Sequence, residues 1–130
     1  MTEGESVRVD TLSERCVLVV EDDPTIRELY TLLLHDEGYH VETAVDGQDG
    51  LDRLACEPDL ILLDLMMPFM DGREFLRRMR SRTEQADTPV IVISAAAEGL
   101  TVAGAQAVMQ KPFDAQALLR HVSGLLAPAG

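Results

Sequence analysis

Five short segments with the composition of β-strands recur along this 130-residue chain, and each is followed directly by a polar or charged residue. Most of them are apolar at every position, which is typical of strands buried on both faces of a parallel sheet. The segments cover residues 16–20, 41–45, 60–63, 89–93 and 107–110. Stretches with the apolar spacing of helices separate them. This alternation predicts a doubly wound parallel α/β domain with strand order 2-1-3-4-5.

The helices are predicted over residues 24–38, around residues 51–55, and over residues 72–82 and 114–126. Pro24 suits a helix start because its missing N–H group has no partner there, and Gly38 suits a helix end. The expected inward-facing residues are Ile26, Leu29, Tyr30 and Leu33 in the first helix, Phe75, Leu76 and Met79 in the third, and Leu118, Leu119, Val122, Leu125 and Leu126 in the last.

Two further segments have weaker patterns. Residues 95–104 are small and only weakly amphipathic, so they are predicted to form a poor helix at most. Arg73, Arg77 and Arg80 share one face of the third helix, and this face is predicted to be solvated rather than to bind a partner. Residues 1–14 are polar and aperiodic, which predicts a flexible tail before one domain over residues 15–128.

The net charge of −12 argues against nucleic acid or an anionic membrane as a direct partner, since both require clustered cations. No apolar run approaches the roughly 18 residues that cross a bilayer, and the first residues lack the apolar core of a signal peptide. A cytoplasmic location is therefore expected. Cys16 and Cys56 match no metal-binding spacing, so they are predicted to be free thiols that act as small buried apolar residues.

Chemistry-bearing residues follow four of the five predicted strands. Because parallel strands bring their carboxyl ends to one edge, these residues are expected to meet there. They are Glu21 and Asp22 after the first strand, Asp64 after the third, Ser94 after the fourth and Lys111 after the fifth. Three neighbouring carboxylates repel one another, and a hard divalent cation such as Mg²⁺ removes that penalty. Lys111, the only lysine among eleven basic residues, adds a second positive charge.

An acid, a metal, a lysine and a hydroxyl together suit phosphoryl transfer to a carboxylate, with an aspartate as the nucleophile. Asp64 is the favoured nucleophile because it lies alone, between the acidic pair and the lysine in the predicted strand order. The alternative is that Asp64 only caps a turn. It does not explain why acids, a serine and a lysine also follow the neighbouring strands.

Four motifs carry a resemblance to the receiver domains of bacterial two-component response regulators, over about residues 15–127. They are VLVVEDDP, DLILLDLMMPFMDG, PVIVISA and KPF. The resemblance implies a flavodoxin-like fold in which Asp64 accepts a phosphoryl group. Asp22 and Asp64 would bind Mg²⁺ directly, Glu21 would do so through water, and the backbone carbonyl of Met66 would complete the ligands.

The resemblance also implies that Ser94 hydrogen-bonds the phosphoryl group, that Lys111 pairs with it, and that the Lys111–Pro112 peptide bond is cis. The phosphodonor would be a sensor histidine kinase or a histidine phosphotransfer protein, docking mainly on the helix that begins at Pro24. Such a domain is not an enzyme acting on other molecules; it catalyses only its own phosphorylation and dephosphorylation. A stand-alone receiver without an output domain is the expected organisation.

The chain departs from the family pattern in two places. The family usually has an aromatic ring three positions before the lysine, where this chain has Val108, and that ring relays the phosphorylation signal. The stretch between Ser94 and Lys111 is also shorter than usual, which predicts a shortened fourth helix over residues 96–104. The output face is therefore predicted to be atypical. Met66 and Ala96 are apolar where the family tunes water attack, which predicts a long-lived phosphorylated form.

Three alternatives remain. A pseudo-receiver would be an interaction module that takes no phosphate, although the acidic site is complete. A metal-dependent phosphohydrolase usually has a second acid two residues after its nucleophile, where this chain has Met66. A flavodoxin-like cofactor binder would place phosphate after the first strand, where Glu21, Asp22 and Asp23 would repel it.

Overall fold

The computed structural model describes residues 15–95, 101–111 and 114–126 of the chain. Five parallel strands form one sheet in the order β2-β1-β3-β4-β5, as predicted. The strands are β1 (Cys16–Val20), β2 (His40–Ala44), β3 (Leu60–Asp64), β4 (Val90–Ser94) and β5 (Ala107–Gln110). The described helices are α2 (Pro24–Asp36), α3 (Gly47–Arg53), α4 (Gly72–Arg80) and α5 (Ala115–Leu126), with short 3-10 turns η1 (Leu54–Cys56) and η2 (Thr83–Gln85).

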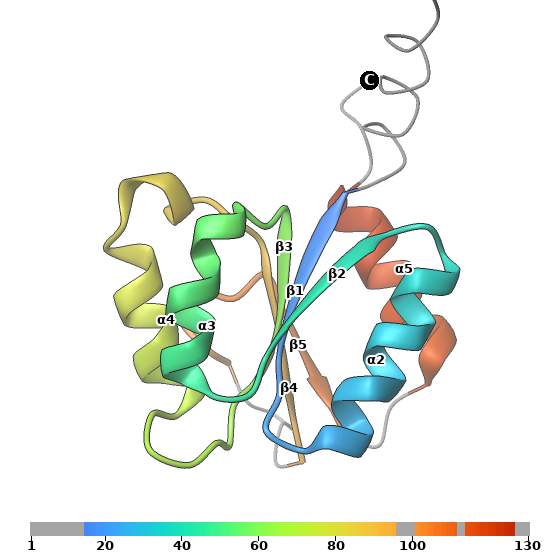
Figure 1. Cartoon of the computed structure of the whole chain (residues 1–130), viewed down its shortest axis with the longest axis horizontal. Coiled ribbons are helices and arrows are strands. Elements are labelled where there is room, and N and C mark those ends of the chain that lie inside the picture. Colours follow the sequence, from blue (N-terminus) through green and yellow to red (C-terminus); the bar gives the residue numbers. More distant parts are fainter. Residues whose placement is uncertain (1–14, 96–100, 112–113, 127–130) are drawn as a thin grey trace, which may run out of the picture.

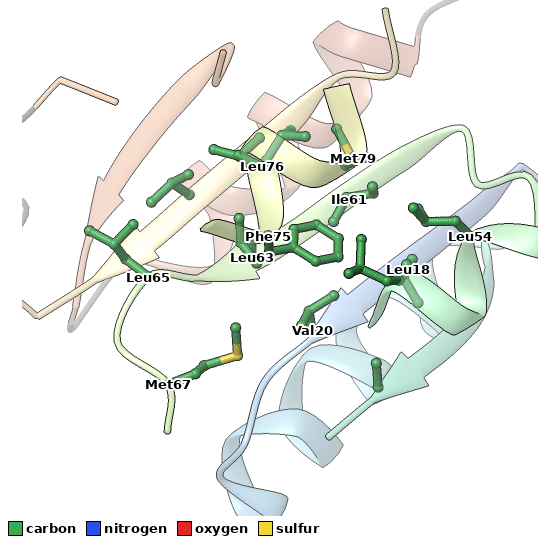
Figure 2. Packing of buried hydrophobic residues seen from close by; sticks show 14 of the residues in the cluster. Leu18, Val20, Leu54, Ile61, Leu63, Leu65, Met67, Phe75, Leu76 and Met79 are labelled. Carbon is green, nitrogen blue, oxygen red and sulfur yellow. The ribbon is translucent and has the colours of Figure 1, made fainter. Parts of the chain in front are cut away.

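Helices cover both faces of the sheet (Figure 1), with α3 and α4 on one face and α2 and α5 on the other. Each face has its own buried apolar cluster. Figure 2 shows the cluster on the face that α3 and α4 cover, where the Phe75 ring points from α4 toward Leu18 and Leu63 of the sheet. Every residue of β3 and β4 is buried, which explains why these strands are continuous apolar runs in the sequence.

An aspartate precedes each of the four described helices, and its side chain accepts hydrogen bonds from backbone N–H groups of the first turn. Before α5, Asp114 accepts from Gln116 N–H at 3.3 Å. Asp23 accepts from Thr25 and Ile26 at 2.9 and 3.2 Å before α2. Asp46 accepts from Asp49 N–H at 2.8 Å, and Asp71 accepts from Glu74 N–H at 3.0 Å. These caps satisfy N–H groups that lack partners inside the helix. The carboxylates of these four aspartates are thus occupied in capping helices. Glu21, Asp22 and Asp64 have no such role.

Several predicted details are wrong. Leu29 and Leu125 are 49% and 36% exposed, because the buried side of α2 runs through Tyr30 and Leu34 and that of α5 through residues 118, 122 and 126. Val45 lies outside β2 and is 48% exposed. Cys16 is only half-buried and Cys56 is exposed, because η1 lies at the surface at the end of α3.

The segment before β5 agrees with the weak pattern of the sequence there. Residues 101–106 form no helix, and residues 96–100 lie outside the described part of the chain. Arg80 is not solvated like Arg73, because its guanidinium donates hydrogen bonds to carbonyl oxygens in the two loops beside α4. No helix within the described residues has the length and hydropathy that a bilayer crossing requires.

Candidate functional site

The sheet register brings the predicted site residues to one edge. Val20 pairs with Leu63, so Glu21 and Asp64 follow neighbouring positions on β1 and β3. Asp64 pairs with Ile93, which puts Ser94 one residue beyond it on β4. The N–H of Lys111 donates to the Ser94 carbonyl at 2.9 Å, which ties the end of β5 to the end of β4. The prediction that these strand ends converge is therefore supported by the backbone itself.

Three carboxylates lie together at this edge. One carboxylate oxygen each from Glu21, Asp22 and Asp64 lies within 4.8 Å of the others. Among the described residues, these three form a group whose spacing could hold a metal ion. Glu21 is 1% exposed and Asp64 is 6% exposed, whereas Asp22 is open to solvent. Burial raises the pKa of Glu21 to about 7 and also raises the pKa of Asp64.

Such a cluster suits a hard divalent cation. Mg²⁺ prefers carboxylate oxygens, keeps several waters, and needs an approach from solvent. The two buried carboxylates supply the negative charge, and exposed Asp22 leaves the cluster accessible. Binding a cation would offset the cost of burying charged carboxylates, which is the largest cause of the raised pKa of both Glu21 and Asp64. The donor set therefore fits Mg²⁺.

Lys111 places its ammonium between the two buried acids. Its Nζ lies 3.3 Å from Glu21 Oε1 and 3.7 Å from Asp64 Oδ2. The lysine side chain is 20% exposed, so this charge acts in a partly desolvated setting where electrostatic effects are stronger than in water. Its charge lowers the pKa of both acids, and burial outweighs it in each case.

Backbone groups hold the acidic side chains in place. The N–H of Met66 donates to Asp64 Oδ1 at 3.2 Å, and the N–H of Asp23 donates to Glu21 Oε2 at 3.1 Å. Gly72 permits the close approach of α4 to the end of β3. A Cβ atom at that position would lie 2.8 Å from the Leu65 Cα and 3.0 Å from the Asp64 carbonyl oxygen.

Two residues near the site were missed from the sequence. The Arg27 guanidinium donates to the carbonyl oxygen of Glu21 at 2.8 Å, which fixes the turn that carries the acids. Arg27 lies one helical turn after the cap Asp23, and this spacing was the available signal. Tyr30 was predicted only as a core residue. Burial, together with the charges of Glu21 and Asp64, raises the pKa of its hydroxyl, so the phenol lies within electrostatic reach of the acids.

The other predicted positions divide into two groups. Ser94 is buried at the end of β4, and Val108 is half-buried in β5 beside the cluster under α4. Pro112 and Ala96 lie outside the described residues, so the cis bond and the role of Ala96 stay predictions. The Met66 side chain is 66% exposed, and its carbonyl as a metal ligand is likewise a prediction.

Comparison with known proteins agrees with this site. Response regulator ArlR of Staphylococcus aureus is 40% identical over 117 residues, which cover 85% of this chain and 52% of ArlR. The chain thus spans about half the length of the curated relatives it matches.

Solved structures are similar over nearly the whole fold. The chemotaxis response regulator CheY4 of Vibrio cholerae is 32% identical with a TM-score of 0.80, covering 87% of this chain and 99% of that one. The receiver domain of the sensor histidine kinase PA1611 from Pseudomonas aeruginosa has a TM-score of 0.82 at 26% identity, covering 88% of this chain and 99% of its own. That structure has a magnesium ion coordinated in its active site cleft.

The family model for the response regulator receiver domain matches residues 17–123, which include all the described site residues. Domains of this family are signalling domains that interact with histidine kinases or phosphotransfer proteins, and Mg²⁺ binding is typical of them. The match, the sheet order and the strand-end acids agree, and this chain belongs to the response regulator receiver domain family of two-component systems.

Proposed function

We propose that Asp64 accepts a phosphoryl group from a phosphohistidine on a sensor histidine kinase or a histidine phosphotransfer protein. The observation that carries the proposal is the position of the Asp64 carboxylate, 3.7 Å from the Lys111 ammonium and within 4.8 Å of two further carboxylates. Asp64 is thus an acid kept at a cationic site where a phosphoryl group can be stabilised.

In the proposed step, one Asp64 oxygen attacks phosphorus while the phosphorus–nitrogen bond of the donor breaks, and the donor imidazole leaves with its electron pair. Lys111 neutralises negative charge on the phosphoryl oxygens, and the Ser94 hydroxyl donates a hydrogen bond to one of them. The Met66 N–H holds the carboxylate in one orientation through Asp64 Oδ1. The domain would catalyse only this reaction and the later hydrolysis of its own acyl phosphate.

Glu21, Asp22 and Asp64 are the residues that would hold Mg²⁺, with the Met66 carbonyl as a further predicted ligand. Bound there, the ion would supply positive charge that the phosphoryl oxygens and the carboxylates share. The proposed setting is the cytoplasm, with protein partners rather than nucleic acid or membrane, in keeping with the net charge of −12.

Intact-mass measurement after incubation with acetyl phosphate and Mg²⁺ tests this proposal. Wild type is expected to gain the mass of one phosphoryl group, and Asp64→Asn is expected to gain none. Omitting Mg²⁺ serves as a second control and should slow the uptake strongly. If the folded wild-type protein gains no phosphate, the pseudo-receiver alternative is correct.

We further propose that the signal leaves this domain without the usual aromatic switch. Val108 has no ring to change rotamer, and it pairs with Val92 inside the sheet. The neighbouring residues 101–106 offer no helical surface. Amide NMR of the phosphorylated and unphosphorylated forms tests this point, with the largest shifts expected near Asp64. Shifts centred on Val108 and residues 96–104 would contradict it.

A further inference from the structure

A pair of cysteine side chains lies at the edge of the sheet opposite the proposed phosphorylation site. Cys16 is the first residue of β1, whereas Glu21 follows the last residue of that strand. Cys56 is the last residue of η1, and its Sγ lies 4.0 Å from the Sγ of Cys16. The two residues are 40 positions apart in the sequence, so the fold brings the thiols together.

The backbone on both sides of this pair is held by hydrogen bonds. The Cys16 N–H donates to Asp59 Oδ2 at 2.8 Å, and the Asp59 N–H donates to the Cys16 carbonyl at 2.8 Å. Glu57, between Cys56 and Asp59, has a φ of 54° and donates its N–H to the Leu54 carbonyl at 2.9 Å. This left-handed residue ends η1 and turns the chain back toward β1. The contact between the thiols is therefore set by the fold, not by a loose surface loop.

Solvent reaches the two thiols to different degrees. Cys56 is exposed, and Cys16 is half-buried behind it. An external reagent therefore meets Cys56 first, and Cys16 lies in position to displace whatever Cys56 has bound. This is the arrangement of an attacking thiol and a resolving thiol.

We infer that Cys16 and Cys56 form a dithiol site that small disulfides convert to an intrachain disulfide. Cys56 attacks the small disulfide, forms a mixed disulfide and releases one thiol. Cys16 then attacks Cys56 Sγ, forms the internal bond and releases the second thiol. The two cysteines lose two protons and two electrons in total, and the small disulfide takes them up to become two thiols.

The charged groups around the two thiols determine whether a cationic or an anionic disulfide reacts faster. The charges of Glu42 and Asp59 act on Cys16, and Glu42 acts on Cys56, where Arg53 opposes it. Burial, the largest cause, raises the pKa of Cys16 to about 12 and also raises that of Cys56, so exchange is slow at neutral pH. With a net charge of −12 on the whole chain, a cationic disulfide is favoured over an anionic one.

The first experiment treats the reduced, folded full-length chain with cystamine, a cationic disulfide, and follows intact mass after an acid quench. Wild type is expected to lose the mass of two hydrogen atoms after passing through one mixed adduct. Cys16→Ser is expected to stop at the mixed adduct, and Cys56→Ser to react far more slowly. Two stable adducts on wild type, or disulfide-linked dimers, would overturn the inference.

The second experiment measures the equilibrium constant for closing the internal disulfide in a cysteamine–cystamine buffer, with and without denaturing urea. We expect the constant to be larger in the folded protein by at least about tenfold, because the fold already holds the thiols together. By linkage, the oxidised protein should then melt at a higher temperature than the reduced one. A constant that is equal or smaller in the folded protein would show that the geometry opposes the bond.

Oxidised glutathione, an anionic disulfide, provides the matched comparison for reagent charge. It is expected to react several-fold more slowly than cystamine at low ionic strength, and added salt should reduce the difference. A faster reaction with oxidised glutathione would contradict the proposed class of reagent. Phosphate uptake at Asp64 is expected to be equal in the oxidised and reduced forms. Failure of disulfide formation can therefore be told apart from failure of phosphorylation.

Discussion

Arg80 holds three parts of the molecule together, and its replacement is the most informative test of the packing beside the site. Its guanidinium donates to the carbonyl oxygens of Thr88 at 2.6 Å, Gly104 at 2.5 Å and Gln85 at 3.0 Å. Longer contacts reach the Ala86 carbonyl at 3.2 Å and Gln106 Oε1 at 3.3 Å. These bonds join the end of α4 to the loops before β4 and before β5.

The size of the effect follows from these bonds. Counting only the three shortest, at about 1 kcal/mol net each, Arg80→Ala should lower the free energy of unfolding by about 3 kcal/mol. Arg80→Lys keeps the charge but cannot reach several carbonyls at once, so it should lose roughly half of this. Arg73→Ala is the matched control on the same helix. Arg73 is exposed and has no hydrogen bond or ion pair within the described residues, so its loss should cost less than about 0.5 kcal/mol.

Urea unfolding at neutral pH measures all three variants. Arg80→Ala should move the midpoint down by roughly 1–3 M with an unchanged slope, and Arg73→Ala should leave it nearly in place. If Arg80→Ala is as stable as Arg73→Ala, the guanidinium bonds do not hold the loops.

Three further predictions follow. In Mg²⁺-free solution the folded protein binds more protons than the unfolded chain between the ordinary glutamate pKa and about 7, because burial raises the pKa of Glu21. The free energy of unfolding should therefore fall as pH rises through this window, and Glu21 alone contributes at most about 1.4 kcal/mol per pH unit to the slope. Glu21→Gln should reduce the slope, and a rise with pH in wild type would contradict the assignment. Phe69 is fully exposed and has a φ of 71°, so Phe69→Gly should raise stability by about 0.5 kcal/mol in thermal or urea unfolding. Ser123→Gly, at an exposed position of α5, should lower stability instead, and two losses of equal size would refute the strain argument. The acyl phosphate on Asp64 should persist for minutes or longer by intact mass at neutral pH, since the Met66 side chain cannot orient an attacking water, and decay within seconds would disprove this.

The sheet and the acidic edge were predictable because both depend on local sequence. A short apolar run that ends on an acid specifies a buried strand and the side chain at its exit, so β3 and Asp64 follow from a few adjacent residues. Parallel pairing then brings the exits of β1, β4 and β5 to the same edge without any knowledge of side-chain contacts. Glu21, Asp64 and Lys111 meet for this reason.

Other contacts depend on the path of the loops in three dimensions, and the spacing of apolar residues in the sequence does not specify that path. Arg80 has the spacing of a solvated residue, yet carbonyl oxygens from the loop that follows α4 and from the loop before β5 converge on it. Cys56 has an apolar neighbourhood in the sequence, yet η1 ends at the surface, where a left-handed Glu57 reverses the chain. The Arg27 contact with the Glu21 carbonyl requires the path of the turn between β1 and α2. Arg80 and Arg27 were therefore missed because the partners of both side chains are carbonyl oxygens of loops.

Borohydride trapping identifies the residue that carries the acyl phosphate, and so it shows whether Asp64 is the phosphoacceptor. The folded protein is treated with acetyl phosphate and Mg²⁺, reduced with borohydride, digested, and mapped by mass spectrometry. We predict that Asp64 is converted to homoserine, and only when both Mg²⁺ and the phosphodonor are present. Conversion at Asp22 or another acid instead, or no conversion in a folded sample, would contradict it.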